Sequence, residues 1–161
     1  MLEIRIKPLT RQAFAPFGDV IEVEGAHSFA INYGMCTRYH DLAKVETTGI
    51  NARTLISLLH GKPYELPLRL DMVERHPLGS QAFVPLSSNP FLVVAAHQQE
   101  NGPGDPLAFL TAPGQGVNIH RNVWHGILTP LHAESTLVVI DRGGDGINLE
   151  EHFYAEPFLI G

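Results

Sequence analysis

Short apolar runs separated by turn-forming residues recur along the whole chain. Six of these runs have the length of strands and cover residues 4–6, 20–23, 54–58, 82–86, 91–96 and 136–140. Twelve Pro and fifteen Gly residues punctuate the sequence, and turn signals about ten residues apart are typical of an all-β sandwich or barrel. The pattern therefore predicts a mainly β fold with a few short helices.

A helix with clear boundaries is predicted at one place. Thr10 is a suitable N-cap for a helix over Arg11–Phe14, and a Pro and a Gly follow shortly after. The polar stretch 98–106 is interpreted as an exposed loop, because strand-like sequence continues on both sides of it. The tail over 150–158 mixes acidic and aromatic residues, and could cover a barrel mouth or reach a second subunit.

The composition is that of a globular protein and excludes some classes of partner. The 161 residues are 44% apolar and 17% charged, which suits one domain over residues 1–161. Eleven basic and seventeen acidic residues give a net charge of −6, the wrong sign for binding nucleic acid or anionic membranes. No run approaches the ~18 apolar residues of a membrane span, so we expect a cytoplasmic protein. Cys36 has no partner cysteine and is expected to be a small buried hydrophobe.

The first candidate site lies at the end of a run of alternating residues. The even positions of this run are Leu66, Leu68, Leu70, Met72, Glu74 and His76, and Val73 is the one apolar exception. Side chains alternate between the two faces of a strand, so the register that buries the leucines also directs Glu74 and His76 inward. Two inward ionisable groups need a partner, a metal or a pocket. Alternatively, the strand leaves the barrel at Val73 and both groups are solvated.

A second strand extends this cluster. Gln81 opens it after a Pro-Leu-Gly turn, so its side chain could lie beside the end of the first strand. The resulting pattern, Glu74-x-His76-x4-Gln81, has the spacing of the first cupin motif, in which two His and a Glu bind a metal. An imidazole and a carboxylate suit a divalent ion, although Gln is a weak ligand.

The second candidate cluster covers residues 118–126. It contains Asn118, His120, Arg121, Asn122 and His125, and it is similar to the second cupin motif with His125 at the ligand position. Neutral imidazoles are suited to acid–base chemistry near neutral pH. The alternative is a His-rich exposed loop.

Two further segments could contribute to the same pocket. Arg142 ends the most apolar strand and could bind a substrate carboxylate in a bidentate manner, although a salt bridge with a neighbour is an equal alternative. Tyr39, His40 and Asp41 could approach the pocket, and a solvated turn explains them equally well.

With these residues in view, the chain closely resembles the bacterial ureidoglycolate lyases, formerly called ureidoglycolate hydrolases. The resemblance spans almost the whole chain and is carried by several long motifs in order. These are Arg38-Tyr39-His40-Asp41-Leu42-Ala43, Glu74-Arg75-His76-Pro77-Leu78-Gly79-Ser80-Gln81-Ala82-Phe83, Gln115-Gly116-Val117-Asn118-x-His120-Arg121-Asn122-Val123-Trp124-His125 and Asp141-Arg142-Gly143-Gly144.

The resemblance implies a cupin-like barrel of the double-stranded β-helix or jelly-roll type, commonly a homodimer. It implies cleavage of (S)-ureidoglycolate to glyoxylate and urea in allantoin and purine nitrogen catabolism. A divalent metal, nickel in the family, is implied without an organic cofactor, and its ligands here are expected to be Glu74, His76, Gln81 and His125.

Ureidoglycolate is a hemiaminal, and its cleavage needs one base at the hydroxyl and one acid at the departing nitrogen. Without a metal, His76 or His125 is the expected base, Glu74 holds the tautomer of that base, and His120 is the acid. With a metal bound, His120 becomes the base.

The substrate carboxylate is expected to meet Arg142 or Arg121, and the ureido group to meet Asn118, Asn122 or Gln81. Three alternatives stay open at this point. They are an amidohydrolase that releases ammonia from the same substrate, a metal-dependent isomerase or dioxygenase, and a module that binds a small acid without converting it.

Overall fold

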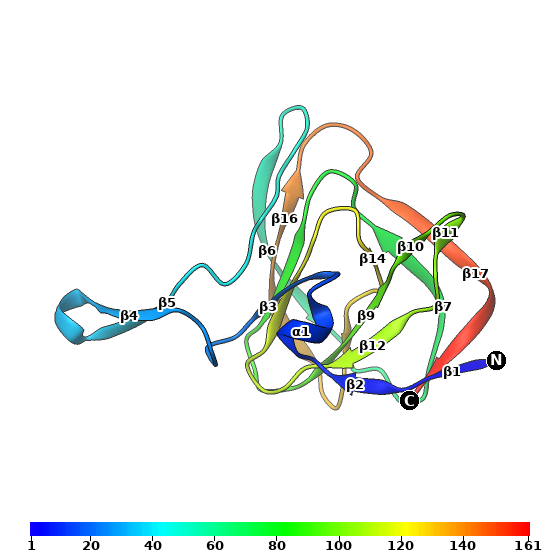
Figure 1. Cartoon of the computed structure of the whole chain (residues 1–161), viewed down its shortest axis with the longest axis horizontal. Helices are drawn as coiled ribbons and strands as arrows, with labels where there is room; N and C mark the ends of the chain where they lie inside the picture. The colour runs from blue at the N-terminus through cyan, green and yellow to red at the C-terminus, as the bar shows by residue number, and fades with distance from the viewer.

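The computed structural model describes residues 1–161 and consists mainly of strands that curve into a barrel (Figure 1). The elements in chain order are β1 (Leu2–Ile4), β2 (Ile6–Pro8), α1 (Arg11–Phe14), β3 (Gly18–Ile21), β4 (Ser28–Ile31), the 3-10 helix η1 (Asn32–Gly34), β5 (Cys36–Tyr39), β6 (Arg53–Gly61), β7 (Leu68–Arg75), β8 (Gln81–Pro85), β9 (Phe91–Ala96), β10 (Gln98–Gln99), β11 (Gly102–Pro103), β12 (Leu107–Leu110), β13 (Gly116–Ile119), β14 (Trp124–His125), β15 (Thr129–Pro130), β16 (Ser135–Gly143) and β17 (Glu150–Ile160). The predicted all-β class is confirmed, and the arrangement is consistent with a cupin-like barrel.

Two sheets form the wall of the barrel. The larger has the order β1-β17-β7-β14-β9-β12-β2, with β15 paired to β9, and the smaller has the order β3-β13-β8-β16-β6. The chain ends lie together because β1 pairs in parallel with β17. Two hairpins, β4–β5 and β10–β11, stand outside these sheets, and Figure 1 shows β4–β5 projecting away from the barrel.

Several sequence predictions are confirmed to within a residue or two. The run 91–96 is strand β9, and the predicted helix is α1, whose N-cap Thr10 accepts a hydrogen bond at Oγ1 from the Ala13 N–H at 3.1 Å. The prediction of one strand over 4–6 is wrong. That segment is broken at Arg5, because β1 pairs with β17 whereas β2 pairs with β12.

Three other predictions need correction. The stretch 98–106 is not simply a loop, since it contains the small hairpin β10–β11. The tail over 150–158 is a strand of the barrel wall and not a separate cover, because it belongs to β17, which pairs with β7; its contact with a second subunit stays a prediction. Cys36 is exposed and not buried, because it lies on β5 of the projecting hairpin, where every residue is exposed.

The core is divided between the two faces of β9. Phe91, Val93 and Ala95 belong to a cluster with residues of both sheets, among them Phe83, Val117, Ile119, Leu137 and Val139. Leu92, Val94 and Ala96 belong to a second cluster with Val73, Trp124 and Phe158 among others. The first cluster fills the space between the two sheets, and its face of the strands is called the interior face below.

The predicted register of the strand ending at His76 is only half right. Leu70 and Val73 both lie in the second cluster, so the alternation is interrupted between them. The irregularity sits where the partner strand β17 shifts register between Phe153 and Phe158. As a result, the leucines of β7 do not share a face with Glu74, and Glu74 faces inward although the leucines face the second cluster.

No helix in the structure is both long and apolar enough to cross a membrane.

Candidate active site

Glu74, His76 and His125 meet on the interior face of the barrel. His125 on β14 lies directly opposite Glu74 on β7 and opposite Ala95 on β9, and directly opposed residues share a face of the sheet. Ala95 is part of the first core cluster. One ligand atom from each of Glu74, His76 and His125 lies within 4.8 Å of the others, and the two imidazole centroids are 5.1 Å apart.

Backbone carbonyls fix the tautomers of both histidines in this cluster. Nδ1 of His76 is 2.8 Å from the Asn148 carbonyl oxygen, and Nδ1 of His125 is 2.9 Å from the Gly126 carbonyl oxygen. A carbonyl only accepts, so Nδ1 carries the hydrogen in each ring. Each Nε2 then has a free lone pair, and both Nε2 atoms are buried without a hydrogen-bond partner. Asn148, and not Glu74, therefore holds the tautomer of His76.

Burial sets the charge states of the cluster. Burial lowers the pKa of His125 to about 4, with the Gly126 hydrogen bond opposing this change and the nearby His76 adding to it. His125 is therefore neutral at neutral pH. Burial also raises the pKa of Glu74, and the nearby Glu151 adds to this change, whereas a positive charge on His76 would oppose it. Glu74 Oε1 lies 3.8 Å from His76 Nε2, too far for a hydrogen bond.

Gln81 faces the same interior. It lies opposite Ile119 across the β8–β13 ladder, and Ile119 belongs to the first core cluster. Its Oε1 is buried and has no hydrogen bond. Buried polar atoms usually have a partner, whereas the interior face presents three acceptors without one, the His76 and His125 Nε2 atoms and the Gln81 amide oxygen.

This donor set suits a divalent metal. Histidine ligands in proteins usually donate their second N–H to a carbonyl or carboxylate, as His76 and His125 both do. First-row divalent ions bind neutral imidazole and carboxylate at about 2.0–2.2 Å, which is compatible with ligand atoms within 4.8 Å of one another. Glu74, His76 and His125 would be three ligands, and the Gln81 amide oxygen a weaker fourth.

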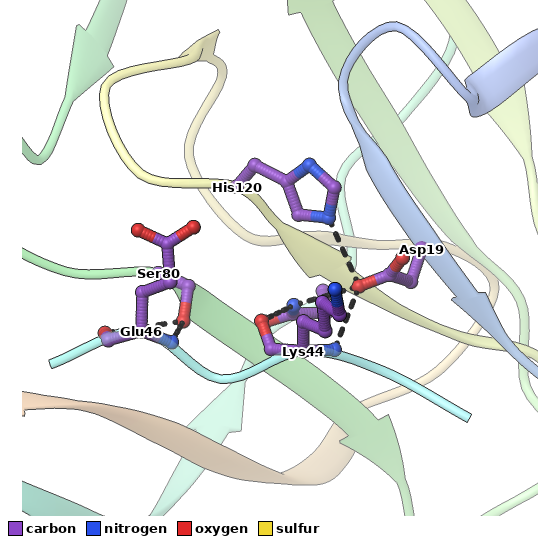
Figure 2. Close-up of polar contacts among 6 residues, drawn as sticks. Asp19, Lys44, Glu46, Ser80 and His120 are labelled. Atoms are coloured by element: carbon purple, nitrogen blue, oxygen red, sulfur yellow. Dashed lines mark hydrogen bonds and ion pairs between the residues drawn. The ribbon is translucent and has the colours of Figure 1, made fainter. Parts of the chain in front are cut away.

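The structure separates His120 and Asn118 from this cluster. Asn118 lies opposite Asp19 on β3 and opposite Ala82 on β8. It precedes Ile119, which faces the interior, so its side chain points to the opposite face of the sheet. Asn118 Nδ2 and His120 Nε2 both lie 3.0 Å from Asp19 Oδ2, as Figure 2 shows for His120. We call Asp19, Asn118 and His120 the outer cluster, because Asp19 on β3 and Asn118 on β13 lie on the face of the smaller sheet that is turned away from the interior.

The remaining candidates have different surroundings. Arg121 Nε pairs with Glu46 at 3.2 Å, and both side chains are largely exposed. Arg142 is 7% exposed, and it donates from Nε to the Thr48 carbonyl at 2.6 Å and from a terminal nitrogen to the Asp145 carbonyl at 2.7 Å. Arg142 thus fastens two loops.

Asn122 contacts the interior cluster through its backbone, whereas His40 lies at the base of the hairpin β4–β5. Asn122 has a left-handed backbone (φ 67°) and donates its N–H to the His76 carbonyl at 2.9 Å. His40 packs against Phe29 and His27 at the base of the hairpin, with centroid distances of 5.4 and 6.2 Å.

Sequence reasoning missed two residues with direct contacts to the candidate histidines. Asp19 is 101 positions from His120, and Asn148 is 72 positions from His76. Both lie outside the motifs, and nothing in their local sequence marks them. The pairing of β3 with β13, and the loop before β17, bring them into place.

Comparison with known proteins decides the family. The family model described as ureidoglycolate lyase matches residues 1–161. The chain belongs to the ureidoglycolate lyase family.

The names of curated relatives agree with this family assignment. A protein named ureidoglycolate lyase 2 from Rhizobium meliloti (strain 1021) is 64% identical over 99% of this chain and 98% of its own length. Proteins named ureidoglycolate lyase from Mesorhizobium japonicum and Chelativorans sp. (strain BNC1) are each 59% identical over 99% of this chain, and over 98% and 97% of their own lengths. The resemblance expected from the motifs is confirmed.

Proposed function

We propose that this protein is a ureidoglycolate lyase that cleaves ureidoglycolate to glyoxylate and urea. The observation that carries the proposal is the interior cluster, where two buried imidazoles offer bare Nε2 lone pairs beside a carboxylate, in a member of the family named for this reaction. Such unpartnered buried acceptors are costly for folding alone, so a ligand or metal is the reason for their arrangement.

The reaction redistributes one proton and breaks one bond. The reacting carbon bears a hydroxyl, a carboxylate and a ureido nitrogen. Loss of the hydroxyl proton turns the C–O bond into a carbonyl, the C–N electron pair leaves with nitrogen, and that nitrogen takes a proton to become urea. Water is not consumed, so the protein needs a base, an acid and a means of holding the two polar arms.

We propose that Glu74, His76, His125 and Gln81 hold a divalent metal, with nickel as the ion implied by the resemblance. When bound, the ion would supply Lewis acidity toward the hydroxyl and carboxylate oxygens of the substrate. The residues themselves are suited to binding the ion and not to moving protons. His125 in particular is a poor base, because its pKa is about 4.

We assign proton transfer to His120 as the base at the hydroxyl, because its loop adjoins the interior cluster. Ile119 lies opposite Gln81, and the Asn122 N–H donates to the His76 carbonyl. Arg121, next to His120, is the better cation for the substrate carboxylate, because its exposed pair with Glu46 is readily exchanged. Arg142 is already occupied by two backbone carbonyls. Asn122 and Gln81 remain the candidates for the ureido group, as amide-like partners. Asn118 is fully buried and its amide nitrogen already donates to Asp19 and to the Lys44 carbonyl.

Incubation of the protein with racemic ureidoglycolate tests the proposal, with glyoxylate, urea and ammonia measured in parallel before and after chelator treatment. Equal glyoxylate and urea without ammonia is the expected result, and chelation should abolish it. Release of ammonia in place of urea would establish an amidohydrolase. Binding of ureidoglycolate without turnover, before and after nickel is added back, would favour the small-acid-binding module.

We also propose that the chain forms a homodimer through the smaller sheet and the hairpin β4–β5. The edge strand β6 exposes Ile56 and Leu58 by 76% and 65%. The hairpin exposes Tyr33 and Met35, and residues 25–37 include no Asp, Glu, Lys or Arg. Figure 1 shows the hairpin projecting on the side of this sheet. Uncharged, exposed apolar surface of this extent marks a protein interface.

Replacing Tyr33 and Met35 with Asp should convert a dimer into monomers, as measured by light scattering after gel filtration. Phe153→Asp is a matched control, because Phe153 is 67% exposed but lies on β17 in the other sheet. A wild-type monomer at micromolar concentration would refute the dimer, and a dimer that survives in the double variant would exclude the hairpin from its interface.

The (S) preference, the role in allantoin catabolism and the cytoplasmic location stay predictions.

A further inference from the structure

The carboxylate of Asp19 collects three hydrogen bonds on one oxygen. Oδ2 accepts from the Lys44 backbone N–H, from Asn118 Nδ2 and from His120 Nε2, each at 3.0 Å. The donors come from two segments, the one with Lys44 and the end of β13, and Figure 2 shows Lys44 and His120 converging on Asp19. Asn118 Nδ2 also donates to the Lys44 carbonyl at 2.8 Å, which fixes the orientation of its amide.

The ionised form of Asp19 is the one that this arrangement favours. Burial raises the pKa of Asp19, but the hydrogen bonds from Asn118, Lys44 and His120 outweigh burial, and the net pKa lies below 3.8. An ionised carboxylate only accepts hydrogen bonds. Nε2 of His120 must therefore carry a hydrogen, and Nδ1 is the nitrogen left free to take a proton.

His120 is thus built in the opposite sense to His76 and His125. Those two rings carry hydrogen on Nδ1, bound to a neutral carbonyl, and point a bare Nε2 into the interior. His120 carries hydrogen on Nε2, bound to a carboxylate, and its side chain is 38% exposed. A carboxylate behind an imidazole stabilises the imidazolium that forms when the ring acts as a base.

We propose that Asp19 is the positioning residue for His120 in ureidoglycolate cleavage, an inference that rests on the proposed function. Asp19 fixes the tautomer that leaves Nδ1 free, and it balances the charge of the ring during turnover. The hydroxyl proton passes to Nδ1 as the C–O bond becomes a carbonyl and the C–N bond breaks. The same proton then passes to the departing nitrogen, giving glyoxylate and neutral urea.

The other charged groups around the ring do not take over this role. Lys44 and Glu46 come from the segment that covers the outer face, and Arg121 comes from the loop of His120 itself (Figure 2 shows the first two). Glu46 is paired with Arg121 at 3.2 Å, and it also anchors its own segment through backbone hydrogen bonds with Ser80. Asp19 is the carboxylate that bonds directly to the imidazole.

Asp19→Asn is the decisive variant, because the amide oxygen can still accept all three hydrogen bonds while the negative charge is lost. We expect kcat to fall on the order of 10- to 100-fold with KM within about threefold, and the acidic limb of kcat/KM to move to lower pH. Glu22→Gln is the matched control. Glu22 is a partly buried carboxylate just after β3 that bonds to Gln115 and pairs with Arg11, and its variant should leave the acidic limb unchanged.

A double variant and a substrate-free measurement complete the test. In a His120→Gln background, Asp19→Asn should change kcat less than about twofold, because Asp19 acts through the ring. NMR should show His120 taking up its proton at lower pH in Asp19→Asn than in the wild type. An unshifted acidic limb, a full additional loss in the double variant, or an unchanged NMR titration would overturn the proposal. If the wild type releases no urea, the proposed function fails, and the NMR titration still judges the pairing of Asp19 with His120.

Discussion

The interior cluster and the outer cluster adjoin, since Ile119 lies opposite Gln81 and the Asn122 N–H donates to the His76 carbonyl, but they present histidines in opposite ways. His76 and His125 are locked by backbone carbonyls and offer Nε2 lone pairs in a buried setting. His120 is locked by the Asp19 carboxylate and is partly exposed. The carbonyl partners of His76 and His125 leave Nε2 free for a metal, whereas the Asp19 carboxylate also stabilises the positive ring that forms when His120 accepts a proton.

This difference arises from a single step along a strand. Ile119 turns into the core, while Asn118 before it turns to the outer face and shares Asp19 with His120 after it. Five residues after His120, strand β14 has crossed to the other sheet and His125 faces inward. The segment from Asn118 to His125 therefore supplies His120 for proton transfer and His125 for metal binding.

The largest effect is expected when one histidine is removed from each of the two clusters. His76→Ala and His120→Ala should each lower kcat/KM for urea release by more than two orders of magnitude, as expected on losing a ligand or a base. Bound metal, measured by elemental analysis, should fall only in His76→Ala. His60→Ala is the control, since His60 pairs with Glu134 on the exposed face of β6. Near-normal turnover in both variants would remove the site altogether.

Acid stability should distinguish the two clusters next. Burial lowers the pKa of His125 from 6.5 to about 4, so the unfolded chain binds a proton in this range that the folded chain does not. The contribution of His125 to the free energy of unfolding is therefore intact above pH 6.5. Up to about 3 kcal/mol of it is lost as pH falls toward 4. Glu74, whose pKa is raised, acts in the opposite direction. Asp19, whose pKa is lowered from 3.8, contributes only below that range.

Urea unfolding of chelator-treated protein between pH 7 and pH 4 measures this loss. His125→Gln should flatten the dependence, and the comparison is cleanest in a Glu74→Gln background, where the opposing group is absent. Equal pH dependence with and without His125 would show that its ring is not the buried neutral group described above.

Motif spacing predicted one site from Glu74, His76, Gln81 and His125. The structure brings one ligand atom of Glu74, His76 and His125 within 4.8 Å of the others and turns Gln81 to the same interior face, and their role as metal ligands stays a prediction. The reasoning for β7 was nevertheless wrong, because the alternation breaks between Leu70 and Val73. The partner of His120 could not be read from the sequence, because β3 is about a hundred positions away and only the ladder of β3 with β13 brings Asp19 beside it.

The smallest expected effect separates the two arginines that the sequence left as alternatives. Arg121→Gln should raise KM about tenfold, equivalent to about 1.4 kcal/mol, while kcat and the melting temperature stay nearly constant, because its pair with Glu46 is exposed and contributes little to stability. Arg142→Lys should do the reverse. Lysine cannot reproduce the two separate bonds to Thr48 and Asp145, so the melting temperature should fall by several degrees while KM of the folded fraction changes little. Steady-state kinetics with thermal unfolding of both variants decides between them, and a large KM effect in Arg142→Lys alone would return the carboxylate to Arg142.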